Sequence, residues 1–199
     1  MPKTVWFVRH AQSLANADKN YRADDFSVPT VPLTPEGLKQ AQEAAGMFDE
    51  KPDLVITSSY LRTKQTAKPL IEKYPGISCL EWSIHEFTYL SLGRCFNTTF
   101  AERKPLREEY WDRNDPFYND GEGAESFNDF MSRVRNTIEA LKIRKEKFIV
   151  LFSHEYTISA VKYLLEKQPK EITPKEMHEF RKYFSLNRVP NTSKIAFIF

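Results

Sequence analysis

The sequence predicts an α/β protein, a three-layer α/β/α sandwich with a mostly parallel central sheet. Short apolar segments rich in β-branched and aromatic residues alternate along the chain with longer segments of helical periodicity. This alternation is typical of parallel sheets covered by helices on both faces. The chain has 199 residues, enough for one such domain with a sizeable core.

The first two elements are a strand and a helix. Residues 4–8 (TVWFV) are β-branched and aromatic, which indicates a buried strand. Residues 33–48 (LTPEGLKQAQEAAGMF) follow the rules for a helix, because Thr34 can cap the N-terminus and Pro35 fits the first turn. The apolar residues that recur on one face of this helix are Leu38, Ala41, Ala45 and Phe48.

Three more elements complete the N-terminal half. Residues 53–59 (DLVITSS) predict a second strand that ends in hydroxyl side chains. Residues 60–74 predict a helix in which Pro69 causes a kink or an early stop. Residues 77–82 (ISCLEW) predict a short third strand.

Residues 87 to about 125 differ in character from the rest. They are rich in aromatic and charged residues, Gly and Pro, and their periodicity is weak. We interpret this segment as an inserted substrate flap within a single domain that spans residues 1–199. Its aromatic residues are expected to anchor it to the body of the protein.

Regular patterning returns after the insert. Residues 126–147 carry an apolar stripe at helical spacing, formed by Phe127, Phe130, Val134, Ile138 and Leu141. The apolar segment 148–153 (FIVLFS) predicts a strand, and two helices over 156–167 and 173–184 follow it. The final segment, 193–199, predicts the last strand.

Chemically reactive side chains follow several of these strands. The residues in question are Arg9 and His10, Arg62, Glu86 and His154. Because the carboxyl ends of the strands form the ligand crevice of an open α/β sheet, we expect these side chains to meet at one edge.

This set of side chains suits phosphoryl transfer to histidine without a metal. Two guanidinium groups can bind the oxygens of one phosphoryl group, and a neutral imidazole is a nucleophile at physiological pH. A carboxylic acid can protonate the departing oxygen. A metal site formed by His10, His154 and Glu86 is disfavoured, because the neighbouring arginines would repel a cation.

The segment VRHAQSLAN (8–16) resembles the signature of the histidine phosphatase superfamily, whose usual form is Arg-His-Gly-x-Ser-x-x-Asn. This superfamily includes cofactor-dependent phosphoglycerate mutases and fructose-2,6-bisphosphatase domains. Further similar segments follow in the expected order, and they are LTPEGLKQAQ, SSYLRTKQTA, ESFNDFMSRV, LFSHEYTISA and VPNTSKIAFIF. The resemblance covers nearly all of the chain outside the insert.

The resemblance implies a role for each matching position. His10 would be the phospho-accepting nucleophile, and Arg9, Arg62 and His154 would hold the phosphoryl oxygens. Glu86 falls where the family has its proton donor, with Glu81 as the rival. Residues that would line the substrate pocket are Gln12, Ser13 and Asn16. Apart from the resemblance, the polar loop after the first motif and the insert offer Arg22, Arg94 and Arg107 as candidates for reading a second anionic group.

Two positions depart from the family pattern. Ala11 replaces the usual glycine after the nucleophile and would be strained if the position required a positive φ. Glu155 replaces the glycine that commonly follows the second histidine. Its carboxylate would repel a phosphate unless it points away or pairs with an arginine of the insert.

The sequence predicts a metal-independent phosphatase that hydrolyses a phosphate monoester through a phosphohistidine on His10, with no cofactor. The alternatives are a mutase of the phosphoglycerate type and a phospho-ligand binding module with impaired catalysis. We expect a small phosphorylated substrate, although a phosphoprotein is also compatible with these residues.

Composition narrows the cellular setting. The formal net charge of +2 argues against a nucleic-acid or anionic-membrane partner. Cys79 and Cys95 fit no zinc or redox spacing, and no segment resembles a signal peptide or a transmembrane helix. We therefore expect a cytoplasmic protein, and the sequence gives no indication of its oligomeric state.

Overall fold

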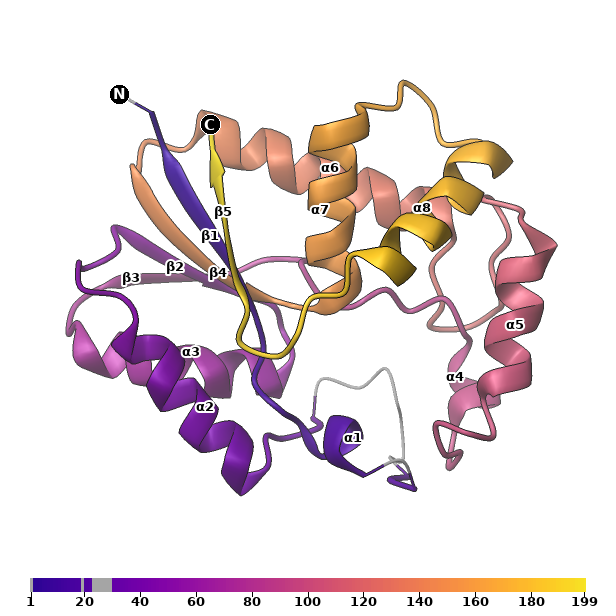
Figure 1. Cartoon of the computed structure of the whole chain (residues 1–199), viewed down its shortest axis with the longest axis horizontal. Coiled ribbons are helices and arrows are strands. Elements are labelled where there is room, and N and C mark those ends of the chain that lie inside the picture. The colour runs from indigo at the N-terminus through magenta and orange to yellow at the C-terminus, as the bar shows by residue number, and fades with distance from the viewer. Residues whose placement is uncertain (1, 19, 23–29) are drawn as a thin grey trace.

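The computed structural model describes residues 2–18, 20–22 and 30–199, and these form the predicted α/β sandwich (Figure 1). The described strands make one sheet in the order β3-β2-β4-β1-β5. Their bounds are β1 Thr4–Arg9, β2 Leu54–Thr57, β3 Ser78–Glu81, β4 Phe148–Ser153 and β5 Lys194–Ile198. The β1–β4, β2–β4 and β2–β3 pairs are parallel and β5 runs antiparallel to β1, so the sheet is mostly parallel as predicted.

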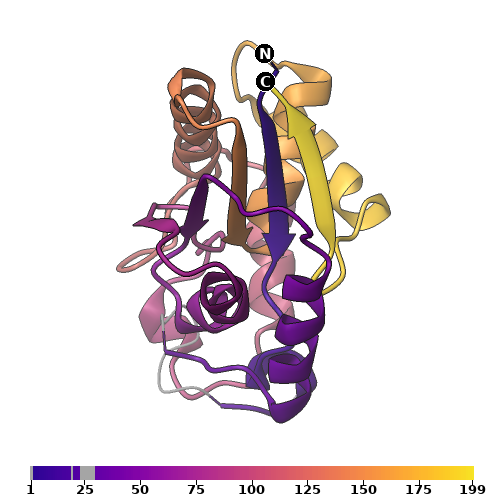
Figure 2. The same ribbon diagram turned by 90° about the vertical axis from the view of Figure 1, so that its left-hand side faces the viewer.

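Helices cover both faces of the sheet (Figures 1 and 2). One face packs against α2 (Pro35–Gly46) and α3 (Leu61–Lys73), and the other against α6 (Phe127–Ile143), α7 (Glu155–Lys167) and α8 (Pro174–Leu186). Successive strand residues serve opposite layers, since Phe7 belongs to the core beneath α6 and α7 whereas Val8 belongs to the core beneath α2 and α3.

Helix boundaries follow the local sequence closely. The hydroxyl of Thr34 accepts a hydrogen bond from the Gly37 amide, as the predicted N-cap of α2 should. The predicted apolar stripe of α6 is entirely buried. Leu38 of the predicted apolar face is 48% exposed, and of the two possibilities at Pro69 the early stop is wrong, because α3 continues through Pro69 to Lys73. The fully buried Leu70 and its packing hold this last turn in place despite the lost hydrogen bond.

The insert (residues 87–125) carries two short helices, α4 (Leu92–Cys95) and α5 (Lys104–Arg113). Figure 1 shows it on the opposite side of the molecule from α2 and α3, with the short helix α1 (Leu14–Ala17) between them. Tyr110 and Trp111 are buried, as expected for anchors, whereas Phe117 is 67% exposed. Whether the insert acts as a flap stays a prediction.

Strand register sets up the functional edge. Arg9 pairs with Ser153, and Thr57 pairs with both Phe152 and Glu81. The carboxyl ends of the four parallel strands therefore lie level at one edge of the sheet, which is where α/β proteins bind ligands. Among the described residues, no helix is long and apolar enough to cross a membrane.

Candidate active site

His10 directly follows β1 and is 3% exposed. Its Nδ1 lies 2.7 Å from the carbonyl oxygen of Ala11. A carbonyl oxygen can only accept, so Nδ1 carries the ring proton and Nε2 has the lone pair. Arg62 directs its Nε–H at that Nε2 from 3.3 Å. The backbone of the next residue therefore selects the tautomer in which Nε2 carries no proton.

His154 and Arg62 complete the centre of the site. The His154 ring centroid lies 5.1 Å from that of His10, and Arg62 Nη2 lies 3.2 Å from His154 Nδ1. Since an arginine can only donate, His154 Nδ1 accepts and its Nε2–H donates to Ser58 Oγ at 2.8 Å. One guanidinium thus bridges both imidazoles, and its own plane lies over the Tyr60 ring, 4.5 Å from the centroid.

Burial and positive charge keep both imidazoles neutral. The pKa of His10 lies well below its usual value, first because of burial and then because of the Arg62 and Arg9 charges. The pKa of His154 is lowered in the same way by burial and by Arg62. Burial also lowers the pKa of Arg62 to about 10, so its guanidinium still carries its charge at neutral pH. Two neutral imidazoles therefore face a fixed cation.

Arg9 is held by a contact that the sequence did not reveal. Its Nη1 donates to the Val189 carbonyl at 2.6 Å and lies 3.0 Å from Glu155 Oε2. Arg188 also binds Glu155, through Nε at 2.5 Å and Nη2 at 3.0 Å. Glu155 therefore pairs with Arg9 and with Arg188 near the C-terminus, and not with an arginine of the insert, which was one of the two possibilities that the sequence left open.

Glu155 is ionised in this arrangement. Burial favours its neutral form, but the Arg188 hydrogen bonds and the Arg9 charge outweigh burial, and the pKa falls below the usual value. Glu86 differs, because burial raises its pKa against the opposing charges of Arg9 and Arg62. Of these two carboxyl groups, Glu86 is thus the one suited to carry a proton into the reaction.

Glu86 is positioned by backbone amides. Its Oε1 accepts from the Phe87 amide at 3.1 Å and from the Tyr156 amide, in the first turn of α7, at 3.0 Å. The rival carboxylate Glu81 is exposed and pairs with Lys64 at 2.7 Å. Glu86 lines the same cavity as His10 whereas Glu81 does not.

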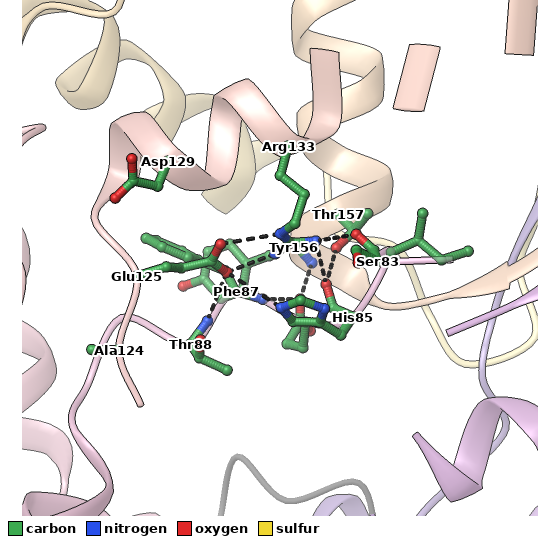
Figure 3. A network of polar contacts seen from close by, with 12 residues as sticks. Ser83, His85, Phe87, Thr88, Ala124, Glu125, Asp129, Arg133, Tyr156 and Thr157 are labelled. Carbon is green, nitrogen blue, oxygen red and sulfur yellow. Dashed lines mark hydrogen bonds and ion pairs between the residues drawn. The ribbon is translucent and has the colours of Figure 1, made fainter. Parts of the chain in front are cut away.

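The loop that carries Glu86 is fastened from α6 (Figure 3). Arg133 Nη1 donates to the carbonyl oxygens of Ser83 at 2.8 Å and His85 at 3.2 Å. Its Nε and Nη2 form a two-bond ion pair with Glu125, which also accepts from the Thr88 amide. These contacts fix the backbone on both sides of Glu86.

The turn after His10 is packed tightly. The buried Ala11 has a negative φ, because it is absent from the positive-φ residues of the described chain, and its amide donates to Thr66 Oγ1 at 3.0 Å. The departure from glycine therefore causes no backbone strain here. Gly37 is required for the packing, since a Cβ at that position would lie 2.0 Å from the Gln12 carbonyl oxygen.

The site opens into a cavity of about 270 Å³. From the sheet edge it is lined by Arg9, His10, Arg62 and Glu86, while His154 lies behind Arg62 and outside the lining. Of the other predicted site residues, Ser13, Asn16 and Arg107 line the cavity and Gln12, Arg22 and Arg94 do not. The Gln12 side chain instead accepts from Thr34, Arg22 pairs with Glu102, and Arg94 binds Asp120 and Glu109.

Sequence reasoning missed several residues of the site. Arg103 and Tyr60 line the cavity, and Ser58 binds His154. Asn191 donates to the His10 carbonyl at 2.7 Å and to Asn16 Oδ1 at 3.3 Å. Asn191 lies in the segment VPNTSKIAFIF, so the similarity of that segment to the family was the signal that could have pointed to it. In the part of the chain that the structure describes, no three His, Cys, Asp or Glu side chains group as metal ligands.

Two known proteins are similar to this chain in sequence. The chain is 25% identical over 87% of its length to fructose-2,6-bisphosphatase of Saccharomyces cerevisiae, and 30% identical over 74% to a probable fructose-2,6-bisphosphatase of Schizosaccharomyces pombe. It covers only 36% and 35% of those two proteins, about a third of their length.

The fold is similar to that of a mycobacterial glucosyl-3-phosphoglycerate phosphatase, with a TM-score of 0.71 at 22% identity over 98% of this chain and 90% of that one. The model of the histidine phosphatase superfamily (branch 1) matches residues 5–190. The chain therefore belongs to the histidine phosphatase superfamily.

Proposed function

We propose that this chain is a metal-independent phosphatase that hydrolyses a phosphate monoester through a phosphohistidine on His10. The observation that carries the proposal is the unprotonated Nε2 of His10, which faces Arg62 in a cavity that Glu86 also lines. The relatives named as phosphatases support phosphatase activity, and they leave the substrate of this chain open.

In the first step, His10 Nε2 attacks phosphorus and the bond from phosphorus to the ester oxygen breaks. Glu86 gives its proton to that oxygen, and the alcohol leaves. Arg62 stabilises the charge on the transferring oxygens from beside the nucleophile, and Arg9 adds a second guanidinium. The role of His154 as a direct phosphoryl ligand stays a prediction, since its contact in this arrangement is with Arg62.

In the second step, water attacks phosphorus while the Glu86 carboxylate takes a proton from it. The bond from phosphorus to His10 Nε2 breaks, phosphate leaves, and both residues return to their starting states. Because Glu86 must begin protonated, the rate is expected to be highest at acidic to neutral pH and to fall as pH rises above the raised pKa of Glu86.

Trapping of the intermediate tests this proposal. The protein is mixed with a chromogenic aryl phosphate, quenched in alkaline denaturant, digested and analysed by mass spectrometry. We expect one phosphoryl group on His10, which acid treatment removes. The variant His10→Ala should lose the label and at least about 10⁴-fold in kcat, while His178→Ala, at an exposed position on α8, should behave as wild type.

Turnover in isotopically labelled water separates hydrolysis from transfer, because hydrolysis places the label in released phosphate. A phosphoryl group on another residue, or full turnover by His10→Ala, would contradict the mechanism. Absence of both label and turnover would favour the phospho-ligand binding module.

A further inference from the structure

We infer that the alcohol part of the substrate is a small aromatic or similarly apolar group that ends in a second anionic group, and is not a polyhydroxylated sugar. The inference rests on the proposed phosphatase activity, because that activity places the phosphoryl group beside His10. The evidence lies in the part of the cavity beyond the sheet edge.

The walls of that part are apolar. Its described lining includes Val31, Phe87, Tyr89, Leu90, Phe100 and Tyr156. The Phe87 ring stacks on Phe130 of α6 at 4.4 Å and 16°, and its centroid lies 5.1 Å from that of Tyr89. These rings belong to the main core, so the wall is a fixed surface against which an apolar ring can pack.

Uncharged polar side chains are few in the cavity: apart from His10 and the tyrosines, its described lining holds Ser13, Asn16 and Thr88. Asn16 Oδ1 accepts from the Ser13 hydroxyl at 3.1 Å and from the Asn191 amide group at 3.3 Å. The Ser13 hydroxyl and the Oδ1 atom of Asn16 are thus engaged with the protein itself. A hydroxylated substrate would leave its own polar groups unpaired against aromatic rings, which costs free energy.

Positive charge lies along the insert side of the cavity. Arg103 and Arg107, at the start of α5, line it in addition to Arg9 and Arg62, while Glu86 is the one carboxylate among the described lining residues. A phosphoryl group beside His10 engages Arg9 and Arg62. Of the two arginines of the insert, Arg103 donates to the carbonyl and the hydroxyl of Thr98, so Arg107 is the one that we assign to a different negative group.

Arg107 is unlike the other arginines at the surface of the insert. Arg94 pairs with Asp120 and Glu109, and Arg113 pairs with Glu109. Within the described residues, Arg107 has no carboxylate within ion-pair distance. It is half-buried, donates to the Phe100 carbonyl at 2.7 Å, and lies over the Phe100 ring at 3.9 Å. A charged group held in this way next to an aromatic wall suits a carboxylate or phosphate on the substrate.

The volume limits the size of the substrate. The cavity, at about 270 Å³, is just below the range of about 300–1,000 Å³ found for pockets that hold drug-sized ligands. A substrate made of a phosphoryl group, one ring and one further anionic group is small enough for a cavity of this volume.

Three substrates with primary alkyl leaving groups test the inference: 4-carboxybenzyl phosphate, benzyl phosphate and glucose 6-phosphate. Their similar leaving groups make kcat/KM report on recognition and not on proton donation. We expect kcat/KM for benzyl phosphate to exceed that for glucose 6-phosphate by about tenfold or more. The carboxylate should add about another tenfold.

The variant Arg107→Gln assigns the second anionic subsite. It should bring the ratio of kcat/KM for 4-carboxybenzyl phosphate to that for benzyl phosphate close to one. The matched control is Arg113→Gln on the same helix, which lies outside the cavity lining and should keep the wild-type ratio.

The outcomes separate this inference from the proposed function. Glucose 6-phosphate turned over as well as benzyl phosphate would overturn the inference and leave the phosphatase intact. A carboxylate preference that persists in Arg107→Gln would overturn the assignment to Arg107. Absence of turnover for all three, with no phosphoryl group on His10, would remove the phosphatase proposal itself.

Discussion

The two ends of the cavity are built in different ways. At the sheet edge, His10 and His154 directly follow parallel strands, are nearly or fully buried, and have hydrogen-bond partners on both ring nitrogens. At the insert end, Arg107 lies on the short helix α5 and is half-buried, and Phe100 lies in a turn before that helix and is 52% exposed. The residues that we propose to perform chemistry are thus fixed by the sheet, while those that we propose to read the alcohol lie where sequence can vary without disturbing the sheet.

The ion pairs at the two ends differ in the same way. The Arg9–Glu155 pair has side chains only 13% and 7% exposed, whereas the Arg94–Glu109 pair of the insert is 32% and 51% exposed. Water and salt screen the second pair, so it contributes little to stability. Loss of one partner from the first leaves a buried charge uncompensated.

The largest difference in kcat is expected between a substitution of an arginine at the sheet edge and a substitution of an arginine in the insert. Arg62→Gln removes the cation that contacts both imidazoles and should lower kcat by about 10²–10³-fold. Arg94→Gln, in the insert and outside the cavity lining, should change kcat less than about threefold. Steady-state kinetics on one aryl phosphate measures kcat for both variants. Equal losses of kcat would contradict the difference between the sheet edge and the insert.

Glu86→Gln should lower kcat for benzyl phosphate by about 10²-fold, because an alkoxide needs a proton when it leaves. The loss should be much smaller for p-nitrophenyl phosphate, whose leaving group is stable as an anion. In the wild type, the rate for benzyl phosphate should fall as pH rises through the raised pKa of Glu86, and the variant should lack this fall. A wild-type rate that climbs steadily to about pH 9 would argue against Glu86 as the acid.

Glu155→Gln tests the buried ion pair through stability. The folded-state pKa of Glu155 lies below its usual value of 4.5, so the ionised carboxylate stabilises the fold above that value. This contribution is lost as pH falls through the lowered pKa. We expect the variant to lose about 2–3 kcal/mol of the free energy of unfolding at pH 7.

Urea titrations measure the gap between wild type and Glu155→Gln, which should narrow as pH falls below 4.5. The exposed carboxylate Glu81, paired with Lys64, provides the control. Glu81→Gln should change stability by less than about 1 kcal/mol. A pH-independent gap for Glu155→Gln would show that its effect does not come from the carboxylate charge.

The smallest expected effect concerns the loop that carries Glu86. Arg133→Gln releases the Ser83 and His85 carbonyl oxygens and should lower kcat for benzyl phosphate by about tenfold. The loss for p-nitrophenyl phosphate should be smaller, because that reaction depends less on the acid. Arg135→Gln is the matched control, since Arg135 also lies on α6 and donates to two backbone carbonyls away from the site. Equal losses on both substrates would mean that Arg133 has only a structural role.

Sequence patterns were sufficient for the sheet and for the residues at its edge. Strand identity depends on local runs of apolar residues, and the carboxyl end of each strand is a position in the chain, so Arg9, His10 and His154 could be located before any packing was known. Local patterns failed where packing decides, as at Leu38, which a helical stripe predicted to be buried, and at Pro69, which a packed helix accommodates.

Contacts between distant segments were decided by the tertiary structure alone. Glu155 meets Arg188 across 33 positions and Arg133 meets the Ser83 carbonyl across 50, and no periodicity of the sequence encodes either meeting. The same holds for the insert, where Arg94 and Arg107 look alike in sequence and only folding directs one to a carboxylate pair and the other to the cavity. The sequence by itself determined which chemical groups the protein possesses and which strands deliver them. The tertiary structure determined their partners, and through those partners their protonation, because burial and neighbouring charges exist only in the folded chain.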